Sequence, residues 1–226
     1  METHLDLAVR QDDFAGGQPF GSVGGYVRLS GRLHLVVDPG APAQQGIVDL
    51  DRAPRNRDGL VECAADVMLL VPRDLARWNR RVLFDWGNRG NKRALQFFND
   101  APHTNTPATM ADAGNGFLMR RGYAVVWAGW QGDLLPGEGR LVLDVPVATG
   151  GGRPITGRVR SEFLVDRAGI RSLPLSTHVS TRGYPAVNPD PRAATFTRRQ
   201  YPGSPPIPIP PEQWQFARVE RDEAGG

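Results

Sequence analysis

Cysteine is almost absent from this chain of 226 residues, which holds Cys63 and no other. A single cysteine excludes an internal disulfide and a cysteine-rich zinc site. Lysine is equally scarce, since the 27 basic residues are 26 arginines and Lys92. A chain without disulfides fits a reducing compartment, so we expect a cytoplasmic protein.

Long hydrophobic runs are also missing, although 40% of the residues are hydrophobic. No apolar run approaches the roughly 18 residues that a membrane-spanning helix needs. The opening residues METHLDLAVRQDD include acidic side chains and lack the apolar centre of a signal peptide. The chain is long enough to bury a core, so we expect a folded protein without a membrane partner.

A concentration of positive charge is missing as well, because the net charge is only +3. Arginines are interleaved with acidic residues, as in DRAPRNRDG at 51–59, so nucleic acid is not an expected partner. The four histidines show no metal-ligand spacing, and the glycines form neither a P-loop nor a dinucleotide fingerprint. We therefore expect no metal and no cofactor.

Two stretches in which apolar and polar residues alternate, 26–38 and 60–71, predict half-buried strands. A shorter strand is expected at 47–50, and turn residues separate the three segments. Strands that follow one another in this way favour an antiparallel meander. Residues 1–24, which are rich in Gly, Asp and Gln, predict a loop segment.

The period changes after Pro72. Continuous apolar runs at 82–84 and 123–128 predict two strands covered on both faces. Between them, 93–99 is a candidate for a short helix, and 106–121 predicts a longer one that begins at a Thr-Pro pair. A helix of that length favours parallel strands joined by a right-handed crossover.

The second half of the chain is less regular. Alternation at 141–147 and 158–165 predicts a β-rich excursion, and the dense prolines of 183–211 predict irregular or polyproline-like chain. We therefore divide the chain into an N-terminal loop segment (1–24), a first sheet (25–135), a β excursion (136–182), and a proline-rich segment with a polar tail (183–226).

Several phrases resemble a known family. LMRRGYAVVWAGWQGD (118–133), together with NRGNK (88–92), is similar to the first half of the α/β-hydrolase fold. The longer phrases FGSVGGYVRLSGR, DLDRAPRNRDGLVE, NRGNKRALQFFNDA and ADAGNGFLMRRGYAVVWAGWQGD resemble bacterial proteins described as α/β-hydrolase domain-containing proteins. The resemblance covers about residues 17–218, and members of that group are longer, with the serine elbow C-terminal to the region present here.

The resemblance implies a fold of the α/β class. We expect a partial α/β-hydrolase-type sheet, with antiparallel N-terminal strands, then parallel strands with a crossover helix, and a β-rich excursion. It also implies that the complete protein is a serine hydrolase or esterase with a small-molecule carboxylic ester as substrate. In that family NRGNK occupies the position of the oxyanion loop.

The candidate site residues lie in two loops that follow the two apolar runs. In NRGNK, backbone N–H groups of a glycine turn can stabilise an oxyanion, or the turn can simply satisfy its own backbone. GWQGD (129–133) can border a pocket at the carboxyl end of a strand, or only pack and turn. The candidates for an oxyanion site or pocket are Asn88, Arg89, Gly90, Asn91, Trp130, Gln131 and Gly132.

A nucleophile is missing. The serine elbow needs G-x-S-x-G, and the closest string, FGSVG at 20–24, has phenylalanine at the first glycine position. No catalytic nucleophile, acid or base is identified, so we expect an inactive N-terminal part of a hydrolase. The alternative is a non-catalytic β-rich module that binds a ligand or a partner. A sheet left incomplete exposes an edge, through which we expect self-association or binding of a C-terminal half.

Overall fold

The structure, a computed structural model, describes residues 2–6, 12–176, 178 and 180–217. The chain divides into two compact units. The first contains Met1–Ile155 and His178–Arg182, and the second contains Thr156–Thr177 and Gly183–Gly226. Both candidate loops belong to the first unit, so the sheet of that unit is the part that positions them.

Two long antiparallel strands form the centre of the first unit. β3 (Tyr26–Val37) pairs with β4 (Val61–Pro72) along its whole length, as the alternation of both stretches predicted. β1 (Glu2–Asp6) and β2 (Asp12–Phe14) pair with successive parts of β3. The expectation that residues 1–24 form only loop is therefore wrong, because two short strands in this segment pair with the edge of β3.

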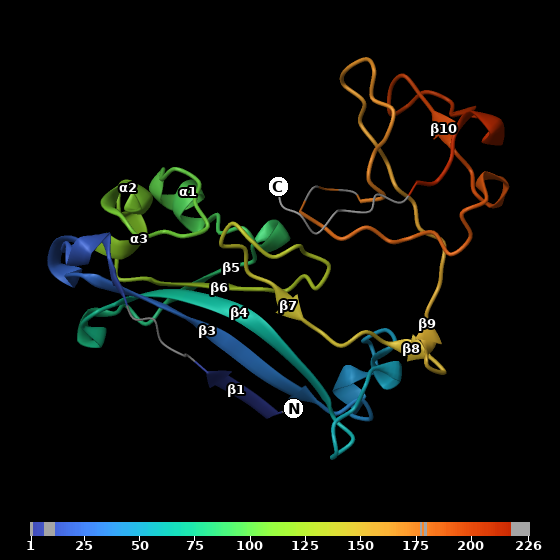
Figure 1. Cartoon of the computed structure of the whole chain (residues 1–226). Helices are drawn as coiled ribbons and strands as arrows, with labels where there is room; N and C mark the ends of the chain where they lie inside the picture. Colours follow the sequence, from blue (N-terminus) through green and yellow to red (C-terminus); the bar gives the residue numbers. More distant parts are fainter. Residues whose placement is uncertain (1, 7–11, 177, 179, 218–226) are drawn as a thin grey trace, which may run out of the picture. The chain divides into compact units, whose positions relative to one another are not determined.

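Two further strands extend the sheet on the other side of β4. β6 (Ala124–Ala128) pairs antiparallel with β4, and β5 (Val82–Asp85) pairs parallel with β6. The order is β1-β3-β4-β6-β5, and β7 (Leu143–Asp144) also pairs with β4. The predicted parallel pairing of the two apolar runs is confirmed, and β5 is the last strand of the sheet (Figure 1).

The prediction of an α/β fold is wrong. The described residues are mostly β and irregular structure, in a curled mixed sheet that contains one parallel pair (Figure 1). The three α-helices among them are short: α1 (Ala94–Asn99), α2 (Met110–Ala113) and α3 (Phe117–Arg120).

The single helix expected at 106–121 is replaced by α2 and α3. Thr109, and not Thr106, caps α2, in a capping box with Asp112. Gly114 and Gly116 adopt φ values of +56° and +66°, which end one helix before the next begins. The connection between the parallel strands is therefore a series of turns with short helices, too little helix to make an α/β layer.

Short 3₁₀ helices occupy many of the connections: η1 (Ala15–Gly17), η2 (Gly21–Val23), η3 (Pro42–Gln44), η4 (Leu50–Arg52), η5 (Leu75–Arg77), η6 (Asn88–Gly90), η7 (Pro191–Ala193) and η8 (Pro211–Gln213). The prediction of a strand at 47–50 is wrong, because residues 47–49 form a turn and η4 begins at Leu50.

The β excursion is smaller than predicted. Beyond β7 it contains one hairpin whose strands have two residues each, β8 (Thr149–Gly150) and β9 (Arg153–Pro154). Residues 158–165 lie in no strand. In the second unit, β10 (Thr197–Arg198) pairs with β11 (Ile207–Pro208). Proline has no N–H to donate, which agrees with the shortness of these pairs.

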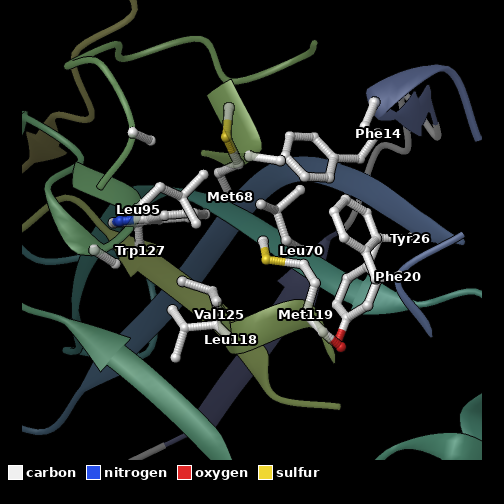
Figure 2. Packing of buried hydrophobic residues seen from close by; sticks show 14 of the residues in the cluster. Phe14, Phe20, Tyr26, Met68, Leu70, Leu95, Leu118, Met119, Val125 and Trp127 are labelled. Atoms are coloured by element: carbon white, nitrogen blue, oxygen red, sulfur yellow. The ribbon is translucent and has the colours of Figure 1, made fainter. Parts of the chain in front are cut away.

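The core of the first unit lies between the sheet and the three helices (Figure 2). Tyr26 is fully buried, and its hydroxyl lies 2.9 Å from the carbonyl oxygen of Tyr123 and 3.1 Å from that of Met119. Burial raises the pKa of Tyr26 well above its usual value. Asn99 is also fully buried, and its side chain bonds the backbone of Ala113 and Leu118, which fastens the helices to one another.

Candidate functional site

The two loops predicted from the sequence lie side by side. NRGNK follows β5 and GWQGD follows β6, and the parallel pairing of these strands brings their carboxyl ends to the same edge. The backbone N–H of Arg89 donates a 2.6 Å hydrogen bond to Oε1 of Gln131. The two candidate segments are therefore joined directly, as expected for strands that point the same way.

A third segment completes the junction. The N–H of Leu141 donates to the carbonyl oxygen of Gly90 at 3.0 Å, and the N–H of Leu143 donates to that of Gln131 at 3.1 Å. Gly90 has a φ of +73°, and a Cβ there would lie 2.5 Å from the carbonyl oxygen of Leu141. A Cβ at Gly132 would lie 2.8 Å from the Val145 side chain. Close backbone packing thus requires glycine at position 90, whereas at position 132 the nearest atom belongs to a side chain.

The NRGNK loop uses its polar groups within the protein. The N–H of Arg89 is occupied by Gln131, and the N–H of Asn91 donates to the carbonyl oxygen of Asn88 at 3.2 Å. The Asn91 side chain also bonds that carbonyl oxygen, and it accepts from the amide of Asn105 at 3.0 Å. An oxyanion hole needs donors aimed at the reacting atom, so the geometry favours a self-satisfied turn at this loop.

Lys92, the one lysine of the chain, is buried beneath this junction with 3% of its surface exposed. Its ammonium group donates to the carbonyl oxygens of Asn105 at 2.8 Å and Gly139 at 2.7 Å. Burial lowers the pKa of Lys92 to about 8, an effect that Asp66 opposes and Arg28 reinforces. Lys92 therefore holds three segments together through neutral acceptors.

Asp85, the last residue of β5, was not identified from the sequence. Its Oδ2 accepts the N–H groups of Arg93 and Ala94, each at 2.7 Å, and the indole N–H of Trp127 at 2.6 Å. The carboxylate thus stabilises the start of α1 and ties it to β6. A lone Asp nine residues before the first residue of a helix forms no recognisable motif, because the contact depends on the fold.

Three aromatic side chains remain on the surface next to the junction. The indole of Trp130 donates to the carbonyl oxygen of Gly87 and lies 5.9 Å from the Trp86 ring. The Trp86 ring lies 5.9 Å from that of Phe84. Their exposed fractions are 43% for Trp130, 69% for Trp86 and 49% for Phe84. We call these three residues the aromatic surface.

β5 itself is more exposed than predicted. The run 82–84 was expected to be covered on both faces, but Val82 is 53% exposed and Phe84 belongs to the aromatic surface. A run of three apolar residues cannot distinguish a covered strand from one at the edge of a sheet. Within the part of the chain that the structure describes, β5 pairs with β6 and has no strand on its other side.

The free edge of β5 presents specific backbone groups. The carbonyl oxygen of Arg81 accepts the N–H of Ala124, at 3.0 Å, so this carbonyl group points toward β6. Successive residues of a strand point these groups to opposite sides. The N–H and carbonyl groups of Val82 and Phe84 therefore point away from β6, toward the free edge.

A serine and a histidine lie together elsewhere in the first unit. The Oγ of Ser180 is 2.7 Å from Nδ1 of His178, which also accepts the Ser180 N–H at 3.1 Å. Ser180 is only 3% exposed, and its carbonyl oxygen accepts the N–H of Leu135. A buried hydroxyl two residues from its partner closes a turn and is poorly placed to attack a substrate.

Other site types find little support. No group of three metal-ligating side chains occurs among the described residues. Two hollows of the described surface have no residue of either loop in their lining. One, in the first unit, is lined by residues such as Phe20, Met110 and Arg120, and the other, in the second unit, by residues such as Asp190 and Glu212. Among the residues that the structure describes, no helix is both long and apolar enough to cross a membrane.

Comparison with known proteins adds no relative: no protein-family model, no curated protein and no solved structure matches this chain.

Proposed function

We propose that this protein is a non-catalytic, β-rich module that binds a partner protein by accepting an extended segment on the free edge of β5. The observation that carries the proposal is the combination of an unpaired strand edge with the aromatic surface beside it, to which β5 contributes Phe84. An unpaired edge offers a row of N–H and C=O groups that a further strand can bond.

β5 is short, but it lacks several other features that protect edge strands. Its four residues, Val82–Asp85, contain no proline and no lysine, and no bulge interrupts its register with β6. An added strand would bond the backbone of Val82 and Phe84 and place alternate side chains against the aromatic surface. Each 100 Å² of apolar surface covered contributes about 2.5 kcal/mol before the cost of ordering the partner.

One observation favours a second function, that of a part of a longer serine hydrolase acting on carboxylic esters. The two loops that the family resemblance assigns to the oxyanion side do meet at the carboxyl ends of β5 and β6. In this proposal another segment supplies nucleophile, acid and base, and Gln131 releases the N–H of Arg89. A cytoplasmic location belongs to both proposals, since each concerns a disulfide-free chain.

The first proposal is tested with a displayed library of random eight-residue peptides, selected against the purified chain. We expect enrichment of peptides with alternating apolar residues, and at least tenfold weaker binding to Phe84→Pro. Proline removes an N–H that points to the free edge and spares those that pair with β6.

Phe97→Ala is the matched control, because Phe97 is an exposed aromatic residue of α1 (69%) outside the edge. It should bind the selected peptides as the unaltered chain does. Peptides that bind Phe84→Pro equally well, or a library that yields no binder, would overturn the proposal.

A further inference from the structure

Charges of opposite sign flank the free edge. Arg81, which precedes β5, has an exposed side chain, and Asp85 ends the strand four residues later. Between them lie Val82, Leu83 and Phe84, which are apolar. The edge is therefore basic at its start and acidic at its end, so an antiparallel strand of the same sequence complements it.

We propose that the segment bound at the free edge is β5 of a second copy of this chain, paired antiparallel about a two-fold axis at Leu83. The inference rests on the proposed function and names the partner. In this register Val82 lies opposite Phe84 of the second copy, and Arg81 lies opposite Asp85 of the second copy. The same surface serves on both copies, as a two-fold interface requires.

Backbone geometry restricts the possible registers. The groups that point to the edge belong to Val82 and Phe84, so these residues form the hydrogen-bonded pairs, and Leu83 faces its own copy in a non-hydrogen-bonded pair. Two such pairs exchange about four backbone hydrogen bonds.

Charge selects among the registers that remain. Pairing Val82 with its own copy places Arg81 opposite Leu83, and pairing Phe84 with its own copy places Asp85 opposite Leu83. In both of these a charged side chain faces an apolar one. Pairing Val82 with Phe84 is the register that brings the two opposite charges together.

Asp85 retains an oxygen for this contact. Its three described bonds all end on Oδ2, and none of the described residues donates to Oδ1. The bond to Arg81 of the second copy can therefore form without disturbing the start of α1.

The pairing is short, so the dimer is weak. Four-residue strands with one aromatic cluster on each copy bury less than the roughly 1,200 Å² typical of stable complexes. We expect a dissociation constant of roughly 10–100 µM. The protein then dimerises reversibly, and the dimeric fraction increases with its concentration.

Sedimentation velocity over a roughly hundredfold concentration range measures this equilibrium. The unaltered chain and Phe97→Ala should shift from monomer to dimer, and Phe84→Pro should stay monomeric throughout. Arg81→Glu should weaken the dimer by about tenfold, because it places two carboxylates opposite each other. Circular dichroism melts of each variant show whether it is folded.

Disulfide trapping reports the register. In a Cys63→Ser background, Leu83→Cys places two thiols in a non-hydrogen-bonded pair about 4.5 Å apart at Cα, within disulfide range. Mild oxidation should cross-link it. Val82→Cys faces residue 84 of the second copy, so it should not cross-link alone, but it should do so when mixed with Phe84→Cys.

The outcomes separate the two proposals. The chain could stay monomeric and still bind library peptides that Phe84→Pro no longer binds. That result would contradict the proposal that a second copy of the chain is the partner, and it would leave the proposed function standing. A dimer that Phe84→Pro does not affect uses another surface and overturns the inference. Cross-linking of Val82→Cys alone, without Leu83→Cys, overturns the register.

Discussion

Gln131 occupies the backbone N–H of Arg89 through a 2.6 Å hydrogen bond to its Oε1. The bond joins the turn after β6 to the loop after β5. It uses the amide that an oxyanion site in this loop would have offered, because Arg89 lies at the tip of η6 with a φ of +55°. The side chain of Gln131 therefore keeps the N–H of Arg89 occupied, and without this side chain that N–H would be free to bind another acceptor.

Gln131→Ala should open this junction without unfolding the protein. A neutral hydrogen bond contributes about 1 kcal/mol, so we expect the free energy of unfolding in urea to fall by that amount. Hydrogen exchange at Arg89 should accelerate more than at neighbouring amides. Gln45→Ala, at an exposed glutamine, is the control and should change neither quantity. Unchanged exchange at Arg89 would show that the bond does not protect it.

Part of this architecture could be predicted from the sequence. The alternation of 26–38 and 60–71 identified β3 and β4, because a sheet with differing faces imposes a period of two. Two apolar runs separated by a long connection predicted the parallel pair β5 and β6, and hence the meeting of both loops. These features depend on local patterns and on one rule of chain connection.

The rest depends on contacts that no local pattern records. The exposure of Val82 follows from the place of β5 at the end of the sheet, which the run itself does not encode. The role of Asp85 requires α1 and Trp127 to be folded against it. Gly114 and Gly116 lie inside the stretch 106–121 that was predicted as one helix, and their positive φ values interrupt it.

The purified chain should show no serine-hydrolase activity. No elbow motif is present, and Ser180, which does lie beside a histidine, is buried. A fluorophosphonate probe should label none of the serines, while an active serine esterase in the same reaction is labelled. Cleavage of p-nitrophenyl acetate should not exceed that of bovine albumin. Stoichiometric labelling of Ser22, Ser161 or Ser180 would locate a nucleophile that the geometry does not support.

Lys92 should make stability depend on pH. Its pKa falls from 10.5 in the unfolded chain to about 8 in the folded protein. Between these values the unfolded chain binds more protons, so the free energy of unfolding should rise as the pH increases from about 8 toward 10. This lowering of the pKa corresponds to a change in the free energy of unfolding of at most about 3 kcal/mol.

Lys92→Met isolates this contribution. Methionine keeps the length of the side chain and removes the titrating group, so the stability of the variant should lack the rise above pH 8. Urea unfolding of both proteins at matched pH values measures the difference between them. A difference that does not change with pH would mean that Lys92 keeps its ordinary pKa in the folded state.

Gly114 should be far less replaceable than a glycine with open space around its Cα. Its φ of +56° disfavours any L side chain, and a Cβ there would clash with the carbonyl oxygen of Asn99, the residue that fastens the helices together. Gly114→Ala should therefore lower the free energy of unfolding by about 3 kcal/mol or more.

Gly46→Ala is the matched control, since a Cβ there meets nothing within 4 Å and the φ of Gly46 lies outside the positive range. It should leave stability unchanged or raise it by about 0.5 kcal/mol. Equal stability of the two variants in urea would mean that the Asn99–Gly114 contact does not determine how the three helices pack on the sheet.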